Sequence, residues 1–197
     1  MDVFKKMALE LLKEDAYKKG DFTLSSGKKS QHYINCKPVT LDGTGSFYIA
    51  NLMLDMVYDD SNSLGVAGLT LGADPLVSNI VMLHGARAYA TDCGACHPDS
   101  PKKYAGLIVR KKPKGHGTGA WIEGPELPKG SIVTVVEDVI TTGGSALFAV
   151  EKLREHGYIV NRIITLVDRQ EHDRSIWKEN DLQLESAFNI KDFAREH

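Results

Sequence analysis

The sequence predicts an α/β fold with a mostly parallel central sheet that is flanked by helices. Two segments carry this prediction, since each joins a short apolar run to a loop of small residues and then to a helix. In the first, the apolar residues 64–69 lead into the loop 70–73. In the second, the apolar residues 132–136 lead into acids, hydroxyls and glycines. Strands that alternate with helices form parallel sheets, whose ligands bind at the carboxyl ends of the strands.

The N-terminal part predicts two helices that are separated by a polar stretch. Apolar residues recur at helical spacing within residues 4–12, and the first helix is expected to end at Gly20. Residues 21–45 are polar and rich in loop-forming residues, and residues 46–58 predict the second helix. The length of the chain leaves room for a small appendage beside the main domain.

Two further helices follow the two loops that define the fold. Asp74 suits a helix cap and Pro75 the first helical position, so the third helix is expected to begin there and to reach about residue 84. The fourth is expected to end at Gly157. Its buried face is predicted to consist of the residues Ala146, Ala149, Val150 and Leu153.

The remaining segments are two strands and two loops. Residues 107–109 predict a short strand, and residues 158–167 contain another. Residues 91–104 are rich in turn formers, and residues 111–124 are basic and rich in glycine without an apolar period. The alternation of strands and helices therefore continues to about residue 167.

Length and composition indicate a single domain, residues 1–197, with a sizeable core. The formal net charge is −2, so no overall field recruits nucleic acid or an anionic membrane, and an anion site must be local. No apolar run has membrane-spanning length, and the N-terminus lacks a signal-peptide core. Three cysteines, an odd number, favour a reducing cytoplasm. We expect no nucleic-acid or membrane partner.

Residues 137–145 have the character of a sugar-phosphate site. Thr141, Thr142, Gly143, Gly144 and Ser145 allow backbone N–H groups to surround an anion, and the following helix adds its dipole. The preceding pair Glu137-Asp138 could hold sugar hydroxyls or a hydrated metal ion. The segment has neither the ending of a Walker A loop nor the spacing of a dinucleotide fingerprint.

Residues 110–119 combine four cations and a histidine with three alternating glycines. Taken alone, such a run is as consistent with a solvated surface loop as with a site. A flexible basic loop also suits a pyrophosphate leaving group, because closing it neutralises charge and excludes water. The cations that we expect to act in this way, together with the histidine, are Arg110, Lys111, Lys114 and His116.

These segments resemble the type I phosphoribosyltransferases, and among them the orotate phosphoribosyltransferases. Residues 137–145 are similar to the signature that binds phosphoribosyl pyrophosphate (PRPP), residues 71–75 to the pyrophosphate loop, and residues 110–119 to the mobile catalytic loop. The resemblance implies that PRPP contacts Gly72, Ala73, Arg110, Lys111, Lys114, His116, Glu137, Asp138, Val139, Ile140, Thr141, Thr142, Gly143, Gly144 and Ser145.

The base side of the site also rests on the resemblance. Residues 22–35 are similar to the hood that covers the base, so the hood is expected to comprise about residues 1–45. The resemblance implies that orotate contacts backbone groups of Tyr33 and Ile34, the hydroxyl of Thr141 and the guanidinium of Arg169. It further implies a cytoplasmic homodimer with shared sites, and Mg²⁺ that arrives with PRPP, without a dedicated protein metal site.

Some positions depart from the family pattern. Ser25 stands where many members carry a lysine, Gln31 replaces a proline, and Lys28 is only a weak substitute for that lysine. The pair Leu71-Gly72 stands where some members have tyrosine and lysine. The interpretation is an enzyme that makes orotidine 5′-monophosphate in pyrimidine biosynthesis. A transferase for another base and a non-catalytic PRPP-binding regulator remain alternatives.

One motif stands outside this interpretation. Residues 93–97 read Cys-Gly-Ala-Cys-His, which satisfies the pattern for covalent haem attachment. Haem of that type is attached in exported compartments, and a zinc site would need further ligands with paired spacing. A plain loop is the favoured interpretation. Residues 92–103 form an insertion relative to shorter family members.

Overall fold

A six-stranded sheet forms the centre of the molecule in the computed structural model, which describes residues 2–23, 29–58, 62–91, 104–114 and 119–194. Its order is β5-β4-β3-β6-β7-β8, and all its pairs are parallel except β4–β5. The strands are β3 (Gly65–Leu69), β4 (Ala105–Val109), β5 (Ile122–Glu123), β6 (Thr134–Ile140), β7 (Arg162–Asp168) and β8 (Gln183–Asn189). The predicted α/β fold with a mostly parallel sheet is confirmed.

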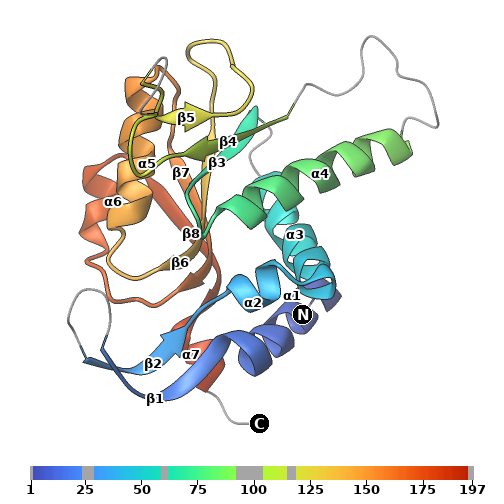
Figure 1. Ribbon diagram of the computed structural model, residues 1–197, viewed down its shortest axis with the longest axis vertical. Helices are drawn as coiled ribbons and strands as arrows, with labels where there is room; N and C mark the ends of the chain where they lie inside the picture. Colours follow the sequence, from blue (N-terminus) through green and yellow to red (C-terminus); the bar gives the residue numbers. More distant parts are fainter. Residues whose placement is uncertain (1, 24–28, 59–61, 92–103, 115–118, 195–197) are drawn as a thin grey trace.

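Helices cover both faces of the sheet (Figure 1). α3 (Gly43–Tyr58) and α4 (Asp74–Thr91) lie on one side, and α5 (Gly144–Glu155) lies on the other. Neighbouring strand residues point to opposite faces, so Val136 belongs to the core under α3 and α4, whereas Val135 belongs to the core under α5. Both cores are closely packed with aliphatic side chains, which makes the sheet a rigid platform.

The helices predicted from the two loops are confirmed. α4 begins at Asp74, as expected, but continues to Thr91 instead of ending near residue 84. The predicted face of α5 is buried, and Gly157 follows its end with φ of +98°. That left-handed backbone is the conformation that glycine adopts at helix ends without strain.

Two sequence expectations about boundaries are wrong. The first helix does not reach Gly20: α1 (Val3–Leu11) continues as a π-helical turn (Leu12–Ala16), and Gly20 lies inside β1 (Tyr17–Thr23). It lies where the pairing register shifts between Lys19 and Phe22, and glycine tolerates such a bulge. The strand expected at residues 132–136 instead extends to Ile140, because Val139 and Ile140 pair with Val167 and Asp168.

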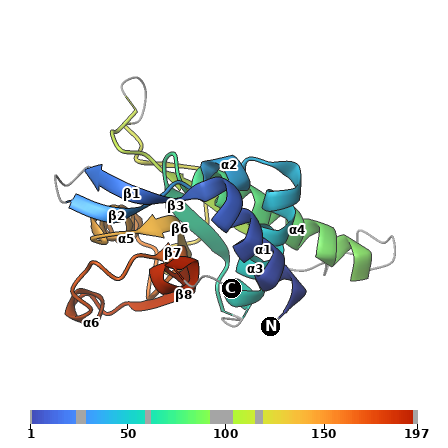
Figure 2. The same ribbon diagram turned by 90° about the horizontal axis from the view of Figure 1, so that it is seen from below.

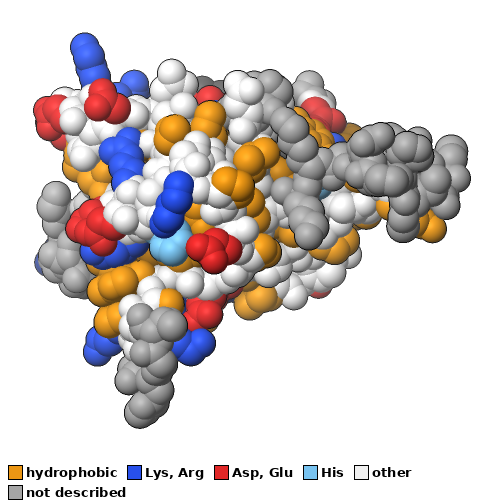
Figure 3. Space-filling model, turned by 90° about the horizontal axis from the view of Figure 1, so that it is seen from above, with side chains coloured by type: hydrophobic (Ala, Val, Ile, Leu, Met, Phe, Trp, Pro, Cys, Tyr) orange, Lys and Arg blue, Asp and Glu red, His pale blue; other side chains and the backbone are white. Residues whose placement is uncertain are grey.

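The hood is built on a separate two-stranded sheet. β1 pairs antiparallel with β2 (Lys29–Ile34), and a short α2 (Lys37–Thr40) leads into α3. Seen from below, this hairpin lies across the end of the molecule at which β6 and β7 end (Figure 2). The opposite end, seen from above, carries acidic and basic side chains interspersed with apolar ones (Figure 3).

The C-terminal part adds elements that the sequence did not predict. They are α6 (Ser175–Glu179), the edge strand β8 and α7 (Ile190–Ala194). Arg162 and Glu185 join β7 to β8 through two hydrogen bonds of 2.9 and 2.7 Å. Among the described residues, no helix is long and apolar enough to cross a membrane.

Candidate active site

The site lies where the two central strands meet. β3 and β6 are neighbours, but the chain proceeds from β3 to β4 on one side and from β6 to β7 on the other. This reversal of strand order opens a crevice at the carboxyl ends, which is where open α/β sheets bind ligands. The loops after the two strands meet there, since a Cβ placed on Gly72 would lie 2.4 Å from Oδ1 of Asp138.

The adjacent acids Glu137 and Asp138 form a partly desolvated pair in this crevice. Glu137 is only 6 % exposed, and its Oε2 has no hydrogen-bond partner within the described residues. Burial, followed by the negative charge of Asp138, raises the pKa of Glu137 well above 4.5, and the charge of Lys111 opposes this. A buried carboxylate oxygen without a partner is suited to accept a hydrogen bond from a ligand hydroxyl.

Asp138 has a different environment. Its Oδ1 accepts a hydrogen bond of 2.9 Å from the backbone N–H of Val139, and its Oδ2 lies 3.9 Å from Nζ of Lys37. Its side chain is 13 % exposed, so one edge reaches the crevice. The two acids therefore present one free and one already oriented carboxylate to the same space.

The loop after β6 presents backbone donors. Gly143 has φ of +85°, and α5 begins at the next residue with no side chain capping it. In the described part of the chain, the backbone N–H groups of Thr142, Gly143, Gly144 and Ser145 have no acceptor. Unpaired N–H groups at the start of a twelve-residue helix attract an anion.

The basic residues follow β4, the strand that pairs with β3. Arg110 Nη1 lies 3.1 Å and Lys114 Nζ 3.5 Å from the same oxygen, Oε1 of Glu123 on β5. Lys111 is exposed, and its charge acts on Glu137. His116 lies outside the described residues, so its expected place is not tested here.

Arg169 connects the hood to the main sheet. It follows β7 directly, is 6 % exposed, and donates from Nη2 to Oγ of Ser30 and to the carbonyl oxygen of His32, at 2.9 and 3.0 Å. The same nitrogen lies 2.7 Å from Oε1 of Glu171. Its Nε is buried and has no partner among the described residues. Because β2 carries Ser30 and His32, the guanidinium holds the hood against the end of β7.

Comparison with known proteins identifies the family. No family model matches the chain. The orotate phosphoribosyltransferase of Thermosynechococcus vestitus is 50 % identical over 184 residues, which cover 93 % of this chain and 89 % of that protein. That of Nostoc sp. is 42 % identical over 197 residues, which cover 100 % of this chain and 88 % of that protein. The chain belongs to the orotate phosphoribosyltransferase family.

Solved structures agree with this assignment. The orotate phosphoribosyltransferase of Mycobacterium tuberculosis in complex with PRPP superposes with a TM-score of 0.72 at 29 % identity, covering 98 % of this chain and 99 % of that chain. An adenine phosphoribosyltransferase from Thermoanaerobacter pseudethanolicus reaches a TM-score of 0.61 at 16 % identity, which supports only the shared fold. The predicted type I phosphoribosyltransferase architecture is confirmed.

Most of the residues predicted for PRPP in this member of the family lie around one crevice. Gly72 lies against Asp138, and Thr141 to Ser145 follow the acids in the loop after β6 and the first residues of α5. Val139 and Ile140, which are also expected to contact PRPP, are the last two residues of β6, and Ile140 is buried. Both residues pair with β7, Val139 with Val167 and Ile140 with Asp168. The carbonyl oxygen of Ile140 accepts the backbone N–H of Arg169.

The predicted base-side residues differ in exposure. Tyr33 is 40 % exposed on β2, whereas Ile34 is buried beneath it. Thr141 is half-buried at the end of β6. Ser25 and Lys28 lie outside the described residues, as do Cys93, Cys96 and His97. The described residues contain no group of three or more side chains that could bind a metal.

The sequence did not single out several side chains that shape the site. Lys37 and Cys36 follow the hood and contact Asp138, through an ion pair and a weak thiol hydrogen bond of 3.9 Å. Burial raises the pKa of the Cys36 thiol well above 9.0, so the sulfur stays protonated. Glu123 and Ser30 are further examples. No local sequence pattern predicts that these residues belong to the site, because their partners lie far away in the sequence.

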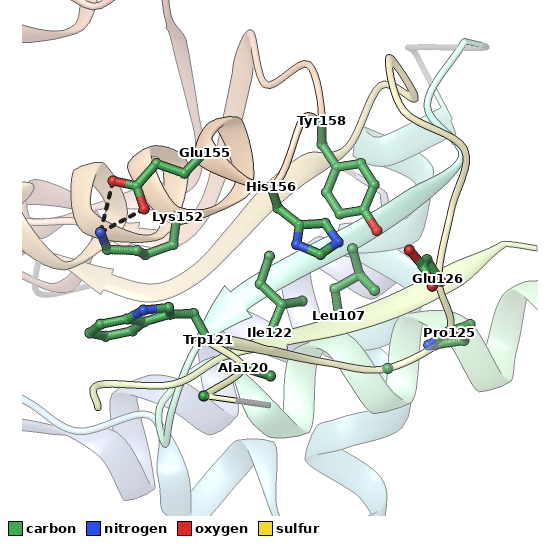
Figure 4. A pocket seen from close by; sticks show the side chains of 12 residues that line it. Leu107, Ala120, Trp121, Ile122, Pro125, Glu126, Lys152, Glu155, His156 and Tyr158 are labelled. Carbon is green, nitrogen blue, oxygen red and sulfur yellow. Dashed lines mark hydrogen bonds and ion pairs between the residues drawn. The ribbon is translucent and has the colours of Figure 1, made fainter. Parts of the chain in front are cut away.

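A separate cavity of about 560 Å³ lies at the C-terminal end of α5 (Figure 4). Its lining includes Leu107, Trp121 and Tyr158, and Lys152 stands over the Trp121 ring at 5.0 Å while pairing with Glu155. None of the predicted site residues lines it. The cavity is therefore distinct from the crevice of the acids.

Proposed function

We propose that this chain transfers the 5-phosphoribosyl group from PRPP to orotate, giving orotidine 5′-monophosphate and pyrophosphate in the synthesis of UMP. The observation that carries the proposal is the crevice in which an acid pair, unpaired loop N–H groups and the Gly72 loop converge. Sugar hydroxyls, a phosphate and a pyrophosphate are the three parts of PRPP that such groups recognise. Two relatives that match nearly the whole chain are orotate phosphoribosyltransferases, which supports orotate as the base.

The roles of the acids and of the phosphate loop follow from their contacts. Glu137 and Asp138 accept hydrogen bonds from the ribose hydroxyls, for which the free Oε2 of Glu137 is available. The N–H groups from Thr142 to Ser145 bind the 5-phosphate at the start of α5. These contacts hold the ribose while the bond to C1 changes, which is catalysis by positioning.

The reaction proceeds by displacement at C1 of the ribose. A ring nitrogen of orotate forms a bond to C1 from one face and releases its proton to solvent, while the bond from C1 to the pyrophosphate oxygen breaks and its electron pair leaves with pyrophosphate. Arg110, Lys111, Lys114 and His116 stabilise the negative charge that develops on the leaving group. The ion pairs of Arg110 and Lys114 with Glu123 are half-exposed, so these cations can exchange Glu123 for a phosphate oxygen.

Mg²⁺ fits this site as a companion of PRPP. The pyrophosphate and ribose oxygens of PRPP would supply most of the hard ligands that Mg²⁺ prefers, because the described residues contain no group of three or more side chains that could bind a metal. Asp138, whose side chain is 13 % exposed, would attract the ion by its charge. When bound, the ion neutralises charge on the pyrophosphate. Removal of Mg²⁺ with a chelator is expected to weaken PRPP binding, which calorimetry measures without any turnover.

Orotate is expected to lie between the hood and the end of β7. Tyr33 and Ile34 offer backbone groups, Thr141 a hydroxyl, and Arg169 a guanidinium whose Nε has no partner among the residues that the structure describes. A guanidinium fork suits a carboxylate, and the base carries one. Arg169 would then bind the substrate and the hood at the same time, so that the hood is drawn over the base.

The proposal includes a homodimer with shared sites in a reducing, cytoplasmic compartment. Met82 and Tyr89 are 62 % and 69 % exposed, and their spacing places them on one face of α4, while Leu71 in the preceding loop is 71 % exposed. Apolar side chains exposed along α4 and in the loop before it support a second copy as their cover. Mixing Lys114→Ala with Asp138→Asn tests sharing: regained activity supports it, and none speaks against it.

One assay tests the proposed reaction against its alternatives. The chain is incubated with PRPP, Mg²⁺ and orotate, and then with adenine, guanine, hypoxanthine or uracil, while base consumption is followed. Consumption of orotate supports the proposal. Consumption of another base instead indicates a transferase of different specificity, and binding of PRPP without turnover indicates a regulator. Either of the last two results refutes the proposal.

A further inference from the structure

We propose that Trp177 is a positioning residue for the loop that binds the 5-phosphate, and that His172 and Asp168 hold its indole ring in place. The inference rests on the proposed function, because it takes the loop after β6 as the phosphate site. Trp177 lies on α6, a helix that neither the predicted site nor the proposed mechanism includes.

The indole ring forms the floor of the phosphate loop. A Cβ placed on Gly143 would lie 2.5 Å from Cη2 and 2.9 Å from Cζ2 of Trp177. All three of the nearest atoms around that position belong to this ring. Gly143 therefore packs directly on the indole edge, and its φ of +85° bends the chain over it. A side chain at residue 143 would push the loop and the ring apart.

A chain of hydrogen bonds orients the ring. The indole Nε1 donates to Nδ1 of His172 at 3.1 Å, and Nε2 of His172 lies 3.0 Å from Oδ1 of Asp168. Because Nδ1 accepts from the indole, Nε2 carries the proton and donates to Asp168. The side chain of His172 is 2 % exposed and that of Asp168 is 9 % exposed, so water does not compete with these bonds.

Asp168 anchors this series of hydrogen bonds to the main sheet. It is the last residue of β7, it pairs with Ile140 of β6, and its Oδ1 also accepts from the backbone N–H of Gln170 at 2.7 Å. The path from the strand end to the phosphate loop thus runs through three side chains. A buried tryptophan needs only some acceptor for its N–H, whereas this acceptor is itself held by a carboxylate on a central strand.

The loop needs such support because it lacks its own. Its N–H groups have no acceptor within the described chain, and the carbonyl of Gly143 accepts from Leu147 of α5 at 3.0 Å, a bond that ties the loop to the helix and not to the sheet. Small displacements of a binding group lower rates steeply, since the reacting groups must meet within a fraction of an ångström. The indole sets that height by contact.

A double-mutant cycle tests the contact. Gly143→Ala, Trp177→Phe and the double variant are compared with the wild type by calorimetric Kd for PRPP with Mg²⁺. The phenyl ring is shorter than the indole, so it leaves room for the alanine methyl. The backbone strain of alanine at residue 143 is the same in both backgrounds and cancels. Gly143→Ala is expected to raise Kd about tenfold less in the Trp177→Phe background than in the wild type.

A second pair of variants separates positioning from general stability. His172→Phe leaves the indole N–H without its acceptor and is expected to raise the KM for PRPP about threefold to tenfold, with the KM for orotate unchanged. Leu182→Ala is the control, because Leu182 belongs to the same core as Trp177 but supplies none of the nearest atoms at Gly143. It should lower the melting temperature and leave the KM for PRPP unchanged.

The outcomes distinguish this inference from the proposed function. Equal effects of Gly143→Ala in both backgrounds overturn the positioning role, even if the wild type turns over orotate normally. A rise in the KM for PRPP in Leu182→Ala as large as in His172→Phe overturns it as well. If the wild type binds PRPP but does not consume orotate, the proposed function fails, while the cycle on Kd still decides the role of Trp177.

Discussion

The two parts of the site that are proposed to bind the ends of PRPP are built differently. The floor of the site comprises the acid pair on the central strand β6 and the phosphate loop that follows this strand, and Trp177 packs against Gly143 of that loop. The basic residues 110–114 lie beyond the end of β4, and Arg110 and Lys114 are held by a single half-exposed carboxylate. The floor is held in place by packing before a ligand binds. The basic segment, in contrast, must exchange Glu123 for the ligand.

This contrast matches what each part of the substrate requires. The 5-phosphate end of the substrate keeps its bonds through the reaction, which takes place at C1, so a rigid site loses nothing by holding that end firmly. The pyrophosphate gains charge and then leaves, so its partners must be strong at one moment and released at the next. Exposed ion pairs are weak enough to allow this exchange.

The largest expected effect tests the basic segment. Lys114→Ala is expected to lower kcat about 10²–10³-fold while leaving the KM for orotate little changed, because it removes a charge that acts on the leaving group. Steady-state kinetics measures both constants. Lys112→Ala is the matched control in the same segment and should retain nearly full kcat. Unchanged turnover in Lys114→Ala would remove this residue from the mechanism.

The next effect tests the floor. Glu137→Gln keeps the size of the side chain but removes its charge, so PRPP affinity should fall about tenfold as the ribose loses a charged acceptor. The same change should stabilise the fold by roughly 1–3 kcal/mol at neutral pH, because a buried carboxylate no longer needs to ionise. Activity and stability are thus expected to move in opposite directions.

The sign of the pH dependence follows from the raised pKa of Glu137. The folded state holds the proton more tightly than the unfolded state, so stability from this group falls as pH rises above about 4.5 towards the raised pKa of the folded state. Urea unfolding at several pH values should show a smaller fall in Glu137→Gln than in the wild type. Glu179→Gln, at an exposed position, should match the wild type. Parallel curves for Glu137→Gln and the wild type would argue against a desolvated carboxylate.

Arg169 joins the floor to the hood and should give an intermediate effect. Arg169→Lys keeps the charge but loses the fork, so we expect the KM for orotate to rise about tenfold and the KM for PRPP to change much less. Arg174→Lys, at an exposed position after β7, serves as the control. Equal increases in both KM values would indicate a loosened hood rather than a lost base contact.

The smallest expected effect concerns Glu123, the carboxylate that pairs with Arg110 and Lys114. Glu123→Gln frees Arg110 and Lys114 from their shared carboxylate, and exposed pairs contribute less than about 1 kcal/mol, so stability should barely change. The KM for PRPP should fall about twofold, because Arg110 and Lys114 no longer have to break an ion pair with Glu123 before they bind the pyrophosphate. Glu126→Gln in the same segment should leave both quantities unchanged. A rise in the KM for PRPP would mean that Glu123 orients the cations productively.

The sequence alone determined the alternation of strands and helices, the position of the phosphate loop and the family. Local rules suffice for these features, since helix caps, glycine at a helix end and apolar spacing act over a few residues, as at Asp74, Gly157 and the buried face of α5. Boundaries that depend on partners were missed: β6 reaches Ile140 only because β7 pairs with it, and Gly20 lies in a strand only because β2 is beside it.

Tertiary structure decided which side chains share an environment. The contact of Gly72 with Asp138, the two cations on Glu123, the hood held by Arg169 and the indole beneath Gly143 join segments that are distant along the chain. Sheet order brings them together, and no local pattern encodes sheet order. The residue types within each segment therefore determine which chemistry it can perform, whereas its burial, its charge state and its partners depend on packing.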